Sequence, residues 1–390
     1  MKKLIAIILM AALALSICAC SPINKTDVAV LWADGDTAVS PNSLINAMDR
    51  ALYIENIAYT YYGAGGDEAK QLQQAEEVLN AGCAVLMVEP VNGDAAQSFV
   101  DLAKAKNVPI IFFGAGVHAD VMASYDKCVD IATAKLRLPY IFDQMVCAYV
   151  LGNTEVEKPK DGDMDLDDDG KITYVTIGEI PRDPSGGTTA IAIEKSDDGQ
   201  PVLNKDGSYK KAVELVALDA AFETLVPVEE TIPGGLFGGA TTYRHLETAD
   251  GKTVEMLLVA DDVQAQATLV ALQAMGLNAD ALATCFVPVL TVGSQFDYKS
   301  HVLAGAPQEA EARKAYLEAN KYLVDLTTVA EEDLDKMIYT TTNVIDSGRL
   351  SATVIEDHDG IAEAAAAACA ALLSGKTAEH VLVDYLVYPE

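Results

Sequence analysis

The chain has 390 residues, 51% of them hydrophobic, and this length exceeds what one ordinary core encloses, so two domains are expected. Its 58 acidic side chains outnumber 27 basic ones and give a formal net charge of −31. A field of that sign repels phosphate backbones, which excludes nucleic acid as a partner.

The N-terminal residues have the pattern of an export signal. Two lysines precede the apolar run LIAIILMAALAL, which is shorter than the roughly 18 residues of a membrane-spanning helix. The segment after it resembles a bacterial lipobox, with small Ala19 before Cys20, whereas bulky Ile17 makes Cys18 the weaker candidate. We expect residues 1–20 to be a signal peptide and Cys20 to anchor the protein outside the cytoplasmic membrane through more than one acyl chain.

Strand and helix signals alternate along the first part of the mature chain. Strands are predicted at 27–36, 57–66, 84–90 and 108–116, and helices at 42–56, 67–82 and 94–107. Such alternation indicates right-handed βαβ units around a parallel sheet that is covered on both faces. The first lobe is therefore predicted to be a doubly wound α/β domain.

The acidic stretch DMDLDDDGKIT interrupts this pattern. Asp165, Asp167 and Asp169 alternate and Gly170 follows, as in positions 1, 3, 5 and 6 of an EF-hand loop. A backbone carbonyl from Lys171 and a hydroxyl or bridged water from Thr173 would continue the ligand set. The alternative is a solvated acidic turn. Ca²⁺ is favoured over Mg²⁺, which demands stricter octahedral geometry.

A second series of signals fills the rest of the chain. Strands are predicted at 171–179, 211–218, 254–262, 285–293, 347–357 and 381–390, and helices at 263–276 and 360–376. Three stretches break the rhythm and are interpreted as insertions: 194–211, 226–252 and 295–336. The prediction is a pair of α/β lobes, with a ligand cleft at the carboxyl ends of their strands.

The five cysteines beyond the lipobox lie in apolar contexts and show no CxxC or Cys/His zinc spacing. An odd, widely spread set predicts buried small hydrophobic residues rather than a disulfide framework. The five are Cys83, Cys128, Cys147, Cys285 and Cys369.

Several stretches together resemble the type I periplasmic sugar-binding proteins, most closely the galactose/glucose-binding group. They are QAEEVLNAGCAVLMVEPVNGDAAQSFVDLAKAKNVPIIFFG, SYDKC, DLDDDGKITYVTIGE, ADDVQAQATLVALQAMG and SGRLSATVIEDHDGIAEAAAAACAALLSGK. The resemblance implies a three-strand hinge with crossings near Asp130, Val292 and Leu372. The N-lobe would comprise 27–130 plus 293–371, and the C-lobe 131–292 plus 372–390.

The resemblance also completes the metal site. In that family the calcium loop precedes a strand, and the last carboxylate comes from a distant glutamate. Glu214, five residues before Asp219, is the implied bidentate ligand, with Glu179 as a local competitor. The ion, Ca²⁺, would be structural.

The ligand residues are less well matched. Asp262 matches the C-lobe sugar-binding aspartate of the family, with a helix N-cap as the alternative. Departures occur at Thr37, Val39, Gly114 and Pro184. The candidates for a changed ligand site are Trp32, Asp34, Asp36, Arg182, Asp183 and Asp262. For Trp32, a core position is an equal alternative to stacking on a ligand.

No catalytic constellation is recognisable, because the five histidines form no HExxH and there is no G-x-S-x-G. A glycoside-processing enzyme is the least favoured class. The resemblance implies a monomeric, lipid-anchored binding protein that captures a monosaccharide-like molecule by hinge closure and delivers it to an ABC permease. The alternative is a sensory binding protein that presents its ligand to a membrane receptor or kinase.

Overall fold

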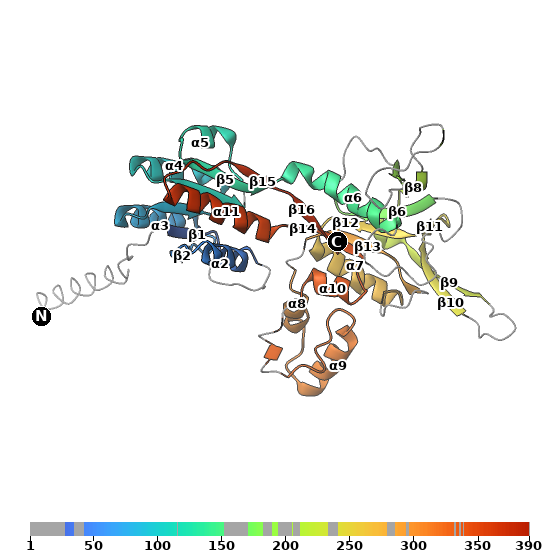
Figure 1. Ribbon diagram of the computed structural model, residues 1–390. Helices are drawn as coiled ribbons and strands as arrows, with labels where there is room; N and C mark the ends of the chain where they lie inside the picture. The colour runs from blue at the N-terminus through green and yellow to red at the C-terminus, as the bar shows by residue number, and fades with distance from the viewer. Residues whose placement is uncertain are drawn as a thin grey trace, which may run out of the picture. The chain divides into compact units, whose positions relative to one another are not determined.

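The computed structural model describes residues 28–34, 43–114, 116–151, 171–181, 189–193, 205, 211–232, 241–278, 285–293, 296–330, 333–334, 337 and 339–389. The chain divides into two compact units. Unit 1 holds the described residues up to Thr133 together with Asp357–Val383, and unit 2 holds Ala134–Glu356 and the residues from Asp384 onward. Both are α/β structures built on largely parallel sheets (Figure 1), so the predicted fold class is confirmed.

Unit 1 is built on a six-stranded sheet in which all neighbouring strands are parallel. In spatial order the strands are β15 (Val381–Val383), β5 (Cys128–Thr133), β4 (Ile110–Gly114), β3 (Val85–Val88), β1 (Val28–Trp32) and β2 (Tyr59–Gly63). Side chains alternate between faces, so Val30 and Trp32 enter one core while Ala29 and Leu31 enter the other. The sheet is therefore buried on both faces.

Helices cover both faces of this sheet. One core contains side chains of α2 (Leu44–Ile54) and α11 (His358–Leu373), and the other contains those of α3 (Glu68–Ala81) and α4 (Ala96–Ala105), next to the short α5 (Ala119–Ala123). The sequence defines the ends of α3. The Asp67 side chain caps its start by accepting from the Lys70 N–H at 3.1 Å, and Gly82 ends it at φ +88°.

Unit 2 contains a seven-stranded sheet with a parallel centre and antiparallel edges. In spatial order the strands are β16 (Tyr385–Tyr388), β14 (Ala352–Glu356), β13 (Val289–Val292), β12 (Met256–Val259), β6 (Lys171–Ile177), β8 (Lys211–Ala217) and β7 (Thr189–Ile193). The helix α6 (Leu138–Leu151) packs on one face. The other face is covered by α7 (Asp262–Ala274), α8 (Tyr298–Ala304) and α10 (Thr341–Asp346).

The points where the chain passes between units differ from the predicted ones. The first passage follows Thr133, within three residues of the prediction, but the second follows Glu356 rather than Val292. The cause is the parallel pairing of β13 with β14, which keeps the chain between them in unit 2. The third follows Val383 rather than Leu372, because β15 pairs with β5 in unit 1.

Two of the predicted insertions have definite structures. The segment 226–252 forms an antiparallel hairpin of β9 (Val226–Ile232) and β10 (Thr241–Glu247), extended by β11 (Thr253–Val254). The segment 295–336 contains α8 and α9 (Ala310–Asn320), and its apolar side chains share the core beneath α7. Most of 194–211 lies outside the described residues.

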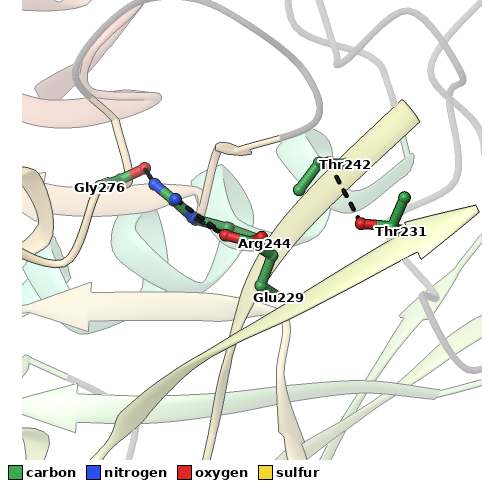
Figure 2. A network of polar contacts seen from close by, with 5 residues as sticks. All are labelled: Glu229, Thr231, Thr242, Arg244 and Gly276. Atoms are coloured by element: carbon green, nitrogen blue, oxygen red, sulfur yellow. Dashed lines mark hydrogen bonds and ion pairs between the residues drawn. The ribbon is translucent and has the colours of Figure 1, made fainter. Parts of the chain in front are cut away.

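Cross-strand contacts hold the hairpin together and join it to α7 (Figure 2). Arg244 lies opposite Glu229 and donates to its Oε2 through Nε at 2.9 Å and Nη2 at 2.8 Å. The Nη1 of Arg244 also donates to the Gly276 carbonyl, just beyond the end of α7, at 3.5 Å. The Thr231 and Thr242 hydroxyls meet across the strands at 3.3 Å.

Candidate functional site

The carboxyl edge of the unit 1 sheet contains two of the predicted ligand residues. Trp32 ends β1 and is only 3% exposed, with its ring edge-to-face against Phe113 at 5.0 Å and Tyr61 at 5.9 Å. This burial favours the core interpretation of Trp32 over a stacking role, because a ring with so little accessible surface offers no face to a ligand. Asp34 follows β1 in a bend and is exposed, and Asp36 lies outside the described residues.

Glu89 stands at the same edge and was not predicted. It directly follows β3, and its Oε2 accepts from the Ala33 N–H, in the turn after β1, at 3.2 Å. The chain that follows β3 is held by Gln71, which is fully buried, donates to the Glu89 carbonyl at 2.7 Å and accepts from the Val91 N–H at 3.0 Å. The sequence signal that could have identified Glu89 is its position directly after a buried strand.

Asp262 lies at the carboxyl edge of the unit 2 sheet, and it is not the N-cap residue of α7. The N-cap of α7 is Asp261, whose carboxylate accepts from the Gln264 N–H at 2.7 Å. The Oδ2 of Asp262 accepts instead from the Phe296 N–H at 2.9 Å and from the Thr341 hydroxyl at 3.4 Å. Asp262 therefore ties the start of the 295–336 segment and the start of α10 to the start of α7.

This arrangement has an electrostatic consequence for Tyr298, which lies in the core next to Phe296. Burial raises the pKa of the Tyr298 hydroxyl, the Thr341 hydroxyl lowers it, and the nearby Asp262 carboxylate raises it further. Tyr298 therefore stays protonated at neutral pH. The two remaining predicted ligand residues, Arg182 and Asp183, lie outside the described residues.

The amino ends of the unit 2 strands hold the described half of the predicted metal site. Lys171 and Glu214 are register partners on β6 and β8, and Glu214 is exposed. On the other side of β6, Glu255 is 3% exposed, and its Oε2 accepts from the Thr173 N–H at 2.7 Å and the Thr173 hydroxyl at 3.0 Å. That hydroxyl also contacts the Thr253 carbonyl at 2.7 Å.

Glu255 is therefore a second unpredicted carboxylate, and it approaches β6 from the side opposite to Glu214. The Glu214 and Glu255 carboxylates, the Lys171 carbonyl and the Thr173 hydroxyl offer oxygen atoms, the ligand type that Ca²⁺ takes. Asp165, Asp167 and Asp169 lie outside the described residues, as does Cys20. The described residues alone contain no group of three or more His, Cys, Asp or Glu side chains placed to hold a metal ion.

A hollow of about 440 Å³ lies away from these residues, between the hairpin and the end of α7. It is lined by Pro227, Val228, Glu229, Arg244 and the residues 273–276, none of which was predicted to bind ligand.

No helix in the described ranges is both long enough and apolar enough to span a membrane.

Comparison with known proteins gives a family match in unit 1. Residues 29–134 match the model of the periplasmic binding protein domain. The D-galactose/methyl-galactoside binding periplasmic protein MglB of Haemophilus influenzae is 25% identical over 114 residues, which are 29% of this chain and 32% of that protein. The match thus spans about a third of the length of that relative. The predicted resemblance to the type I periplasmic sugar-binding proteins is confirmed.

Comparison with solved structures gives matches that cover most of the chain at low similarity. A periplasmic solute binding protein from Actinobacillus succinogenes with bound D-allose is 12% identical, with 93% of this chain and 97% of that chain covered and a TM-score of 0.46. A solute binding protein from Bacillus halodurans with bound myo-inositol is 13% identical, with coverage of 94% and 96% and a TM-score of 0.40.

Proposed function

We propose that this protein is an extracytoplasmic solute-binding protein that captures a small sugar and delivers it to an ABC importer. The observation that carries the proposal is the periplasmic binding protein domain at residues 29–134, which coincides with the parallel sheet of unit 1 from β1 to β5. The division into two α/β units with three chain passages supports it. Ligand contacts that favour a closed form would provide the signal to the permease, and no turnover is expected.

The test is a calorimetric and thermal-shift screen of the purified mature chain against neutral hexoses, pentoses, methyl-galactosides and inositols. A binder should raise the melting temperature by an amount that grows with the logarithm of one plus its concentration over its dissociation constant, and the sugar should be recovered unchanged. Silence across the whole screen would remove sugar capture from consideration. Recovery of a chemically altered sugar would instead indicate an enzyme.

We further propose that Cys20 carries the lipid that tethers the protein to the membrane. The lipobox-like sequence before Cys20 supports this anchor. In cells, the full chain should fractionate with membranes and a Cys20→Ala chain should not. Equal membrane association of both chains would refute the anchor.

We also propose that the acidic loop binds Ca²⁺ structurally. Asp165, Asp167, Asp169, the Lys171 carbonyl and the Thr173 hydroxyl, or a water that it bridges, would hold the ion, which would neutralise converging carboxylates at the start of β6. Glu214 remains the bidentate ligand that the resemblance implies, and the buried Glu255 beside Thr173 is a second competing carboxylate in addition to Glu179.

A further inference from the structure

The strands of unit 1 begin at one edge of the sheet, which we call the amino edge. The register pairs Val28, the first residue of β1, with Tyr59, the first residue of β2, and with Val85, the first residue of β3. Because the strands are parallel, the helices that connect them run back and end at this same edge. The segments between these helix ends and the strand starts are 55–58, 82–84, 106–109, 124–127 and 374–380.

Two large apolar side chains are exposed at the amino edge, where α2 ends. Tyr53 is 82% exposed and Ile54 is 75% exposed, whereas the buried stripe of α2 ends at Leu52. Neither residue is part of the two cores that the described residues of unit 1 form. A single exposed apolar side chain is ordinary on a protein surface. Two adjacent ones of this size, outside both cores, indicate a surface that meets something other than the chain itself.

The charge of the amino edge differs from that of the chain as a whole. Its connecting segments contain three lysines and three acidic residues and are thus formally neutral: Lys106, Lys127 and Lys376, with Glu55, Asp126 and Glu379. The segments that leave the carboxyl ends of the strands, 33–43, 64–67, 89–92 and 115–118, contain four acidic residues and no lysine or arginine. In a chain with a net charge of −31, the amino edge is therefore a side that can approach an anionic surface without a large like-charge repulsion.

The proposed lipid anchor is attached close to this edge. Cys20 precedes Val28 by eight residues, and eight residues span at most about 28 Å when fully extended. Val28 lies beside Tyr59 in the sheet, and Tyr59 follows Ile54 by only five residues. An anchor at Cys20 therefore keeps the end of α2 within reach of the bilayer surface.

We propose that the amino edge of unit 1 is a membrane-contact surface, and that Tyr53 and Ile54 enter the head-group region of the bilayer that carries the anchor. This inference rests on the proposed anchor at Cys20. Tyrosine suits this depth because its ring is apolar while its hydroxyl stays in the hydrated layer. Isoleucine adds apolar area, and Lys106 and Lys127 at the same edge attract lipid phosphates within a Debye length.

This contact has a consequence for the opposite edge of the same sheet. The carboxyl ends of the unit 1 strands, where open α/β sheets bind ligands, would point away from the bilayer. The acidic residues there, such as Asp34 and Glu89, would then stay in the aqueous phase. The distribution of charge between the two edges agrees with this orientation, because the acidic edge is the one that an anionic bilayer repels.

The test uses quenching of tryptophan fluorescence by lipid, because Trp32 is the only tryptophan and is 3% exposed. Residues 21–390 carry an N-terminal hexahistidine tag in place of the lipid. They are tethered by a nickel-chelating lipid to vesicles of phosphatidylcholine and phosphatidylglycerol that contain a phospholipid with a quencher near its head group. The added fluorescence of Tyr53→Trp should be strongly quenched on tethering and should recover when imidazole releases the chain.

Two further variants make the test specific. His118→Trp, at an exposed position on the carboxyl edge of the same sheet, is the matched control and should not be quenched. Adding Ile54→Ser to Tyr53→Trp removes apolar area from the contact and should shift the docking equilibrium about fivefold toward the undocked form. Melting curves without vesicles show that the variants are folded.

The outcomes separate this inference from the anchor on which it rests. Quenching of Tyr53→Trp but not of His118→Trp supports the membrane contact. Equal quenching of both variants, or quenching of neither in chains that float with the vesicles, overturns it. A dimer in sedimentation equilibrium that Ile54→Ser abolishes would assign the surface to a second copy and overturn it as well. Membrane fractionation of the Cys20→Ala chain tests the anchor independently of the tag: failure there overturns both ideas, whereas failed quenching overturns the contact alone.

Discussion

At the scale of single residues, Gln71 is the polar side chain on which the unit 1 edge most depends. It is fully buried and satisfies both the Glu89 carbonyl and the Val91 N–H. Gln71→Leu keeps the volume but leaves both backbone groups without this partner. We expect the free energy of unfolding, measured in urea, to fall by about 1–3 kcal/mol.

The control for this change lies two residues away on the same helix. Gln73 is exposed, and its side-chain amide donates a hydrogen bond to the Glu77 carboxylate, one turn along α3, at 2.8 Å. Gln73→Leu should change the free energy of unfolding by less than about 0.5 kcal/mol. Equal losses for the two variants would mean that the loss at position 71 reflects helix propensity rather than the buried hydrogen bonds.

The buried thiols predict a pH dependence of stability. Burial raises the pKa of Cys83 from 9.0 to about 11 and that of Cys369 to about 12. As the pH rises above 9, the unfolded chain therefore loses these protons before the folded chain does. The free energy of unfolding should fall by up to about 1.4 kcal/mol per pH unit for each thiol, between pH 9 and its raised pKa.

A double variant isolates this effect from the titration of tyrosines and lysines. Cys83→Ala with Cys369→Ala lowers the stability at pH 7 by creating small cavities, so only the slopes are compared. Urea unfolding from pH 8 to pH 11 should give a shallower slope for the variant than for the wild type. Parallel curves would show that these thiols titrate normally.

At the scale of elements, the hairpin of β9 and β10 is connected to α7 through one guanidinium. Arg244 contacts Glu229 and the Gly276 carbonyl, where the negative end of the α7 dipole favours a cation (Figure 2). Its side chain is 39% exposed and that of Glu229 is 53% exposed, so the pair contributes at most about 1 kcal/mol. Arg244→Met should lower global stability by that amount or less.

The same variant should act more strongly on local motion. Hydrogen exchange of the β9 and β10 amides should accelerate in Arg244→Met, because the hairpin loses its polar contact with α7. Lys252→Met removes a more exposed pair, with Asp250, and should leave that exchange unchanged. Acceleration of the same size in both variants would contradict a specific role for Arg244.

The elements themselves were largely predictable, while their assignment to units was not. Near-continuous apolar runs such as VAVLW and IIFFG identify buried parallel strands from the sequence alone. The second chain passage was placed one strand too early, because the long 295–336 insertion hides that β14 returns to the same sheet. Periodicity reports which face of a strand is buried, not which strand lies beside it.

The candidate site shows the same limit at the level of contacts. Asp262 was identified by its position after a strand, but its partners Phe296 and Thr341 lie 34 and 79 residues away. Glu89 and Glu255 were missed because their roles depend on strand register, which brings Ala33 beside one and Thr173 beside the other. Trp32 was left open between ligand and core, and its 3% exposure favours the core.

At the scale of the whole molecule, the net charge of −31 complicates any test of metal binding. Like charges repel in the folded state, and any divalent cation screens them and raises stability without occupying a site. A rise in melting temperature on adding Ca²⁺ is therefore not sufficient evidence. Mg²⁺ at the same concentration supplies the same screening but binds such a loop poorly.

The proposed calcium site predicts a difference between these two ions. After chelation, CaCl₂ should raise the melting temperature clearly more than MgCl₂ at equal concentration, because an ion that binds only the folded chain adds about 2.7 kcal/mol at a hundred times its dissociation constant. Glu214→Gln and Glu255→Gln then identify the carboxylate that completes the site. The variant that loses the excess Ca²⁺ response while remaining folded marks the ligand.

The two glutamates differ in what else their loss should change. Glu214 is exposed, so Glu214→Gln should leave the metal-free melting temperature nearly unaltered. Glu255 is buried and accepts from Thr173, so Glu255→Gln should lower it even without Ca²⁺. Identical responses to Ca²⁺ and Mg²⁺ in the wild type would leave the acidic loop as a solvated turn, and the carboxylates at the start of β6 would then serve the sheet alone.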